Sequence, residues 1–179
     1  MKIVIWFTWE MWCGKDTATA YIQEKLGWVK FKFSQSQRDI LDRIWVEQTR
    51  ENISAVSTFI REAFWQDLLS KIMKKDVLES SEDVILIDWV RRQSDIVYLT
   101  QIPEFKLVYI DTSLKNRYTR ISNRRENADD IWKTMEQFIK EQELETEVQI
   151  RWLKDIADIV IDNNWSFEEF YKQIDNLIK

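Results

Sequence analysis

The sequence predicts an α/β protein built on a parallel β-sheet, because short apolar runs alternate with helical patterns along the chain. Residues 3–7 and 84–88 are continuous apolar runs, which is typical of parallel strands buried on both faces. Helical patterns follow these runs, so we expect right-handed crossovers between the strands. With 179 residues and 45% hydrophobic content the chain can bury a substantial core, and we predict one domain over residues 1–179.

The individual elements follow from the same patterns. Strands are predicted at residues 3–7, 29–33, 84–88, 105–110 and 159–161. Helices are predicted at residues 16–26, 93–99, 114–124, 131–144, 147–157 and 167–178, and residues 37–75 show helical patterns without a strand. Gly27 is expected to end the first helix, Thr49 to begin a helix inside the long helical stretch, and Trp65 to interrupt that stretch.

The turn between the first strand and the first helix has the features of a phosphate-binding loop. Such a loop needs backbone N–H groups that face an anion, a helix N-terminus behind them, and a lysine that reaches the β- and γ-phosphates. Gly14, Lys15 and Thr17 meet these requirements. The pattern G-x-x-x-x-G-K-[ST] has glycine where this chain has Trp9, and a kinase variant of the pattern also has glycine where it has Trp12.

The composition offers an explanation for these two tryptophans. The chain has 10 Trp and only 2 Gly, and together they reach roughly the 7% that glycine alone usually takes. Tryptophan also stands where a turn or a close backbone approach calls for glycine, at Trp9, Trp12, Trp65, Trp89 and Trp165. We hypothesise that UGA codons for glycine were translated as tryptophan. The alternatives are a deliberate glycine-to-tryptophan replacement and a genuinely tryptophan-rich protein; Trp28, beside Gly27, is the best candidate for an authentic tryptophan.

Charge and composition exclude several classes of function. The net charge of −5 provides no general basic field for nucleic acid. The single cysteine, Cys13, cannot form an internal disulfide, and the absence of histidine excludes His-based nucleophile activation and His-ligated metals. No apolar run approaches the roughly 18 residues needed to span a membrane. We therefore expect a cytoplasmic protein without a nucleic-acid or membrane partner, either a monomer or a weak dimer.

Charged residues are predicted to gather at the carboxyl ends of the strands. Asp88 ends the third strand and is followed closely by Arg91 and Arg92, at the rim where Lys15 is expected. A carboxylate and guanidinium groups at this rim suit Mg-ATP, although Asp88 could instead cap a helix and the arginines could form a solvated pair. Arg117, Arg120 and Arg124 share one helix face, which is either functional or an exposed basic face.

Several of these segments resemble a known family. Read with glycine at positions 9 and 12, residues 9–17 become G-E-M-G-C-G-K-D-T, which resembles the P-loop of adenylate-kinase-like and dephospho-CoA-kinase-like enzymes. Residues 88–92, read as D-G-V-R-R, are similar to the D-G-F-P-R segment of nucleoside monophosphate kinases, and residues 120–125 to their R-I-x-G-R-R lid entry. Residues 157–166 resemble the segment around the last strand of both families, whose turn lies near adenine.

The resemblance covers almost the whole chain and implies a three-layer P-loop NTPase fold. In this fold a five-stranded parallel sheet of order 2-3-1-4-5 has helices on both faces. The resemblance also implies a helical acceptor-binding insertion at residues 36–75 and a short lid at residues 120–131.

The same resemblance implies a phosphotransferase that uses ATP and Mg²⁺. Lys15, Arg120, Arg124 and Asp88 would be its catalytic residues, and Asp16 and Asp88 would lie at the metal. The residues implied to bind ATP are Trp12, Cys13, Gly14, Lys15, Asp16, Thr17, Asn163 and Asn164. Asp16 departs from the Ser or Thr usual in P-loops, which weakens its assignment to the metal.

The acceptor is the least determined part of this prediction. Arg38, Arg61, Arg91 and Arg92 are candidates to bind an acceptor phosphate. Dephospho-CoA kinases place an aspartate just after the second strand to take a proton from a ribose hydroxyl, and residues 34–36 are Ser-Gln-Ser here. We therefore expect a nucleoside or deoxynucleoside monophosphate acceptor, with dephospho-CoA-like transfer to a hydroxyl as the alternative. A non-catalytic relative, if the tryptophans are genuine, and a regulatory P-loop ATPase are further possibilities.

Overall fold

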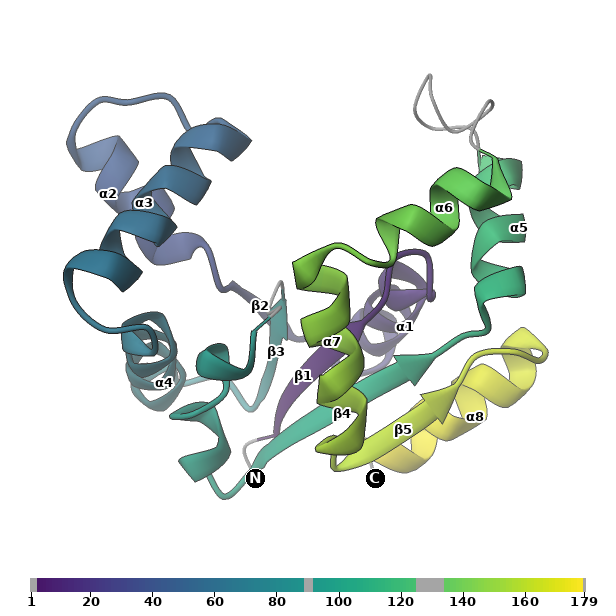
Figure 1. Cartoon of the computed structure of the whole chain (residues 1–179). Coiled ribbons are helices and arrows are strands. Elements are labelled where there is room, and N and C mark those ends of the chain that lie inside the picture. The colour runs from purple at the N-terminus through teal and green to yellow at the C-terminus, as the bar shows by residue number, and fades with distance from the viewer. Residues whose placement is uncertain (1–2, 89–91, 125–133, 179) are drawn as a thin grey trace. The chain divides into compact units, whose positions relative to one another are not determined.

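The computed structural model describes residues 3–88, 92–124 and 134–178, and these contain a five-stranded parallel sheet of order β2-β3-β1-β4-β5 (Figure 1). This order is the predicted one. The strands are β1 (Ile3–Trp9), β2 (Val29–Lys32), β3 (Val84–Asp88), β4 (Phe105–Asp111) and β5 (Ile159–Asp162). The helices are α1 (Lys15–Leu26), α2 (Gln35–Arg43), α3 (Arg50–Ala63), α4 (Leu68–Glu79), α5 (Leu114–Arg124), α6 (Met135–Glu141), α7 (Glu145–Asp155) and α8 (Phe167–Leu177).

The chain divides into two compact units. Unit 1 comprises residues 1–6 and 28–106, and unit 2 comprises residues 7–27 and 107–179. The predicted helical insertion therefore lies in unit 1, and the predicted phosphate-binding loop lies in unit 2. The prediction of one domain over residues 1–179 stays a prediction.

Unit 1 is built around β3, which is almost completely buried. Its residues pair in parallel with β2 on one edge and with residues 3–6 of β1 on the other. The helical stretch forms α2, α3 and α4, and it extends to Glu79 rather than residue 75. Thr49 begins α3 as predicted, because its Oγ1 accepts a hydrogen bond from the backbone N–H of Asn52 at 3.1 Å. The predicted break near Trp65 is confirmed, since α3 ends at Ala63 and α4 begins at Leu68.

The prediction of a helix at residues 93–99 is wrong. Two short 3₁₀ helices, η1 (Gln93–Asp95) and η2 (Leu99–Gln101), occupy this region. The Asp95 carboxylate accepts a hydrogen bond from the backbone N–H of Arg92 at 3.2 Å. Such a local side-chain bond competes with helix propagation, and the β-branched residues that follow Asp95 favour helices only weakly.

Unit 2 carries helices on both faces of β4 and β5. In Figure 1, α7 passes in front of these strands, and α8 lies behind them beside α1. The rings of Tyr21 in α1 and Tyr171 in α8 stack with centroids 4.1 Å apart, and the Tyr21 hydroxyl donates to Asp175 at 2.9 Å. Gly27 ends α1 as predicted, with a φ of 57°.

The helices before β5 differ from the prediction. A single helix at residues 131–144 was expected, but α6 begins at Met135 because Thr134 and Gln137 form a capping box. Residues 131–133 lie outside the described part of the chain. The next helix, α7, begins at Glu145, two residues earlier than predicted, with Leu144 as its N-cap.

Candidate phosphate-binding site

The loop between β1 and α1 has a backbone path that normally belongs to glycine. Gly14 has a φ of 101°, and Trp12 has a φ of 68°. Both values lie in the left-handed region, which residues with a Cβ rarely adopt. A Cβ at position 14 would also collide with Nδ2 of Asn163. Glycine at position 14 is therefore required twice, by its dihedral angle and by its neighbour.

Three donors hold the carbonyl oxygen of Cys13. They are Nη1 of Arg120 at 2.9 Å, Oγ1 of Thr112 at 3.0 Å and Nδ2 of Asn163 at 2.6 Å. Arg120 Nη1 also lies 3.3 Å from the carbonyl oxygen of Trp12. Two consecutive carbonyl groups of the loop thus face the same guanidinium.

These anchors fix the direction of two backbone N–H groups. In a trans peptide the N–H of the next residue points away from the carbonyl, so the N–H groups of Cys13 and Gly14 face away from Arg120. Helix α1 begins immediately afterwards at Lys15, with the positive end of its dipole at this loop. Successive N–H groups ahead of a helix N-terminus form a concave site that suits a phosphate group.

The side chain of Lys15 lies close to two residues of the loop region. Its Nζ lies 4.6 Å from the centroid of the Trp9 ring and 3.1 Å from Oδ1 of Asp16. The Asp16 side chain is exposed, and Thr17 is half-buried in the first turn of α1. The sequence-predicted residues from Trp12 to Thr17 are therefore brought together around one loop.

The thiol of Cys13 is fully buried behind the loop. Burial raises the pKa of this thiol to about 12, although the backbone N–H of Lys15 and the nearby Arg120 guanidinium act in the opposite direction. The thiolate is the reactive form of cysteine, so Cys13 is inert at neutral pH.

No sequence motif points to Glu10, although this residue organises a buried network beside the loop. Its carboxylate lies 3.2 Å from Nη2 of Arg117 and 3.8 Å from Nε of Arg151. The Tyr109 hydroxyl donates to it at 3.3 Å, and burial together with this carboxylate raises the pKa of Tyr109. The available signal in the sequence was a glutamate directly after an apolar strand. Such a glutamate is expected to be buried, and a buried carboxylate needs cationic partners.

Arg117 completes this network from α5. Its Nε donates to the carbonyl oxygen of Thr112 at 3.1 Å, and its Nη1 donates to Oε1 of Gln142 at 2.6 Å. The predicted basic face of α5 is therefore not simply exposed, since Arg117 is 96% buried.

Arg120 is also held by the protein itself. Besides the loop carbonyls, it donates from Nη2 to the carbonyl oxygen of Asn163 at 2.8 Å. Burial lowers the pKa of Arg120 from its ordinary value. These contacts give Arg120 a role in shaping the loop. The side chain of Arg124 and most of the predicted lid, residues 125–131, lie outside the described residues.

Of the two asparagines after β5, Asn163 lies against the loop and Asn164 lies against the start of α5. Asn163 is buried and contacts Cys13, whereas Oδ1 of Asn164 accepts from the backbone N–H of Ser113 at 2.7 Å. Burial tends to raise the pKa of Asp162, but hydrogen bonds from Asn164 and from the indole N–H of Trp165 outweigh burial and lower it. The predicted adenine segment thus forms a hydrogen-bonded turn in unit 2.

In unit 1, the predicted metal ligand Asp88 is buried and forms an ion pair with Lys30 of β2. No group of three or more acidic or cysteine side chains that could hold a metal occurs among the described residues. A metal at Asp88 would therefore depend mainly on phosphate and water oxygens, which is common for Mg²⁺ in nucleotide enzymes.

The predicted acceptor arginines have different surroundings. Arg61 is buried and donates to Asp95 at 2.5 Å, to the carbonyl oxygen of Gln66 at 2.5 Å and to Oγ of Ser94 at 3.2 Å. These contacts hold it between α3 and η1, and its assignment to an acceptor phosphate stays a prediction. Arg38 and Arg92 are half-buried, and Arg91 lies outside the described residues.

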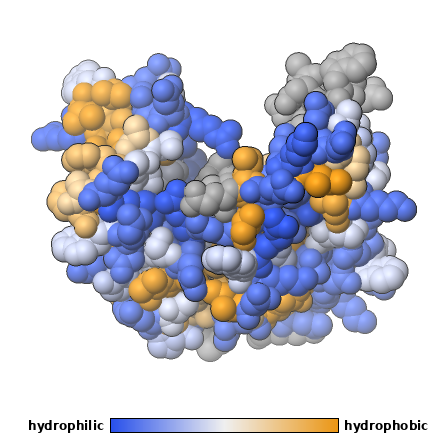
Figure 2. Space-filling model, viewed as in Figure 1, coloured by the Kyte–Doolittle hydropathy of each residue, from blue (hydrophilic) through white to orange (hydrophobic). Residues whose placement is uncertain are grey.

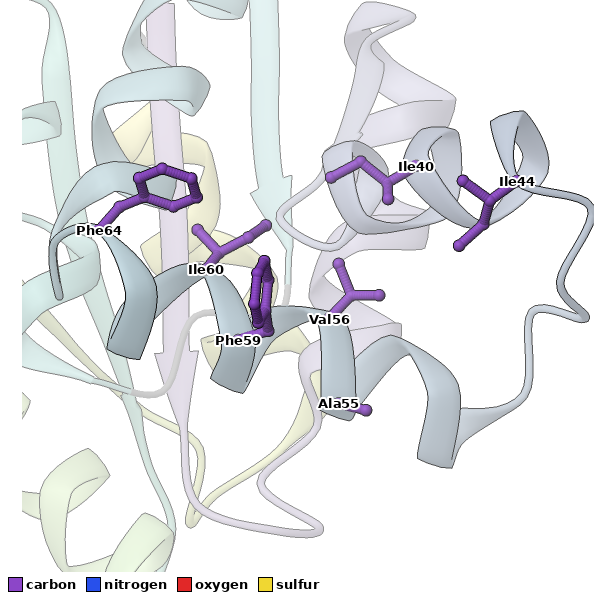
Figure 3. A pocket seen from close by; sticks show the side chains of 7 residues that line it. All are labelled: Ile40, Ile44, Ala55, Val56, Phe59, Ile60 and Phe64. Carbon is purple, nitrogen blue, oxygen red and sulfur yellow. The ribbon is translucent and has the colours of Figure 1, made fainter.

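A hollow of about 430 Å³ lies between α2 and α3 (Figure 3). Only apolar side chains line it, namely Ile40, Ile44, Ala55, Val56, Phe59, Ile60 and Phe64. Figure 2 shows hydrophobic residues gathered over this helix pair. The hollow has the size of a small-ligand site.

The chain is similar in sequence to UPF0200 proteins, and no protein-family profile matches it. The UPF0200 protein of Methanoregula boonei is 26% identical over 142 residues, which cover 79% of this chain and 77% of that protein. The UPF0200 protein of Methanoculleus marisnigri is 25% identical over 166 residues, which cover 92% of this chain and 89% of that protein.

Solved structures establish the fold. Shikimate kinase from Bacteroides thetaiotaomicron matches with a TM-score of 0.60 at 14% identity, covering 98% of this chain and 96% of that one. A gluconokinase from Sinorhizobium meliloti matches with a TM-score of 0.56 at 14% identity, covering 98% and 95%. The chain thus has the α/β P-loop NTPase fold found in P-loop kinases, as predicted. Within the described residues, no helix combines the length and apolarity needed to cross a bilayer.

Proposed function

We propose that this protein is an ATP-dependent small-molecule kinase. The loop of residues 10–14 carries the proposal, because its carbonyls are anchored to Arg120 and its N–H groups face the opposite way, ahead of α1. Phosphoryl transfer depends mainly on positioning and charge neutralisation, and such a loop supplies both for the β-phosphate. Lys15 would bind the β- and γ-phosphates, and the turn at Asn163 and Asn164 would lie near adenine.

Mg²⁺ would neutralise charge on the phosphates during transfer. Asp88 and Asp16 are the carboxylates that we assign to it, either directly or through water. The Lys30 ammonium beside Asp88 competes with a directly bound cation. We therefore favour contact through water, with the ATP phosphates as the principal ligands.

For the acceptor we propose a nucleoside or deoxynucleoside monophosphate. We assign Arg38 and Arg92, which are half-buried guanidinium groups of unit 1, to its phosphate, and the α2–α3 hollow would suit an apolar or planar part of the acceptor. A phosphate oxygen is already nucleophilic, so this acceptor requires no strong base.

A hydroxyl acceptor is the second candidate. Asp88 is a buried carboxylate at the end of β3 that could accept a hydroxyl proton. The structurally similar proteins named above are kinases of shikimate and gluconate. If the acceptor is a hydroxyl, as in dephospho-CoA-like transfer, Asp88 would serve as the base.

The test is ADP release from Mg-ATP in the presence of single acceptors. We would compare a panel of nucleoside monophosphates with dephospho-CoA, shikimate and gluconate. The chain as written and a Trp9→Gly, Trp12→Gly variant are measured side by side, because an indole at position 9 lies against the Lys15 ammonium. Turnover only with hydroxyl acceptors would replace the monophosphate proposal, and acceptor-independent hydrolysis would indicate a regulatory ATPase.

Lys15→Ala provides the control for the site. Loss of a preorganised positive charge at the transferring phosphate costs about 100-fold or more in rate. Lys25→Ala is the matched variant, since Lys25 lies in the last turn of the same helix and contacts Asp175. Equal rates in both variants would show that Lys15 is not part of the site. If neither the chain as written nor the Trp9→Gly, Trp12→Gly variant bound nucleotide, the protein would be a non-catalytic relative of these kinases.

A further inference from the structure

The end of α2 has the hydrogen bonds of a Schellman motif, with Trp45 at the position that favours glycine. The backbone N–H of Val46 donates to the carbonyl oxygen of Leu41 at 2.9 Å, and that of Trp45 donates to Asp42 at 3.2 Å. With Ile44 as the C-cap, this is the pair of bonds that defines the motif. Trp45 has a φ of 60°, as the residue after the C-cap must.

Nothing in the packing explains an indole at this position. The Trp45 side chain is 96% exposed, so it gains almost no burial in return for the strained dihedral angle. A residue without a Cβ would adopt the same backbone at no steric cost.

Trp12 repeats this conflict in the phosphate-binding loop. Its φ of 68° is also left-handed, and its carbonyl oxygen is one of those that face Arg120. This backbone path turns the Trp12 carbonyl toward Arg120, so the dihedral angle follows from the packing of the loop rather than from the indole.

Every positive φ angle among the described residues belongs to a glycine or a tryptophan. Among the described residues, φ is positive at Gly14, Gly27, Trp12 and Trp45. The two non-glycine positions are both tryptophan, although tryptophan accounts for only 10 of 179 residues. Asn and Asp, the residues that usually occupy such positions in place of glycine, are found at neither.

We infer that positions 12 and 45 carry glycine in the working protein, written with a codon that its source decodes as glycine. The inference rests on backbone geometry and is independent of the proposed kinase activity. Glycine at position 12 would give a loop with no side chain at that position.

The test is the mass of peptides from the protein isolated from its source. Trypsin releases residues 3–15, which include positions 6, 9 and 12, and residues 44–50, which include position 45. We expect the peptide of residues 44–50 to have the mass calculated with glycine in place of Trp45. We expect fragmentation of the peptide of residues 3–15 to place glycine at position 12. Residues 107–115 contain no tryptophan and must show their written mass. Tryptophan at both positions, with UGG codons in the gene, would overturn the inference.

Discussion

Replacing Trp45 with glycine should stabilise the protein. The perturbation removes a side chain that makes almost no buried contact, at a position with a φ of 60°. A left-handed conformation costs a residue with a Cβ about 1–2 kcal/mol. The greater chain entropy of unfolded glycine offsets about 0.5–1 kcal/mol of this. We therefore expect a net gain of about 0.5–1 kcal/mol in the free energy of unfolding.

Urea denaturation followed by circular dichroism measures this change. For a chain of this size, a gain of about 1 kcal/mol corresponds to a rise of roughly 2–4 °C in Tm. Trp152→Gly is the matched control, because Trp152 is 64% exposed and lies inside α7. There glycine should lower stability by about 0.5 kcal/mol through its poorer helix propensity. A loss of stability in Trp45→Gly equal to that in Trp152→Gly would refute the reasoning from the dihedral angle.

Three further changes test other parts of the structure. Arg61→Ala should lower the free energy of unfolding by about 3–5 kcal/mol in urea denaturation, because it leaves the buried Asp95 carboxylate without its cationic partner. Thr49→Ala should cost about 1 kcal/mol in the same assay, through loss of the α3 N-cap. Because burial raises the folded-state pKa of the Cys13 thiol from 9.0 to about 12, the unfolded chain loses this proton first, and stability should fall as the pH rises from 9 to 12. Cys13→Ala should show a flatter pH dependence over that range.

Each of these changes has an outcome that contradicts its reasoning. An Arg61→Ala protein as stable as the parent would mean that Asp95 finds another partner or water. A Thr49→Ala protein with unchanged stability would mean that the cap bond contributes nothing net. Identical pH profiles for the parent and Cys13→Ala would mean that the thiol is not protected by burial.

The sheet could be predicted because its signal is local. Each strand is a short apolar run, and β3 matches its predicted bounds because it is buried almost throughout and ends at a carboxylate. The region after Arg92 could not be predicted in the same way. Its apolar spacing suits a helix, but the Asp95 side chain is committed to Arg61, which lies 34 residues away in the sequence.

The candidate site was predictable as a loop but not as a network. Gly14 and Lys15 are recognisable from their spacing to the first strand. The partners that shape the loop come from β4, α5 and the turn after β5, and no spacing rule places Tyr109 or Arg117 beside Glu10. The contact of Arg61 with Asp95 was not predictable, because an arginine in a helical insertion has the same sequence signature whether it faces a ligand or a buried carboxylate.

The hydrogen bonds to the carbonyl oxygen of Cys13 determine where along the gene inactivating substitutions are expected. Asn163, which donates to it, lies 150 residues away in the sequence. Variants at that distant position would change the direction of an N–H group in the loop without altering any residue of the loop. A survey of inactivating variants confined to residues 9–17 would therefore overlook some of the substitutions that disable the proposed phosphate binding, and the turn after β5 is the first additional place to search.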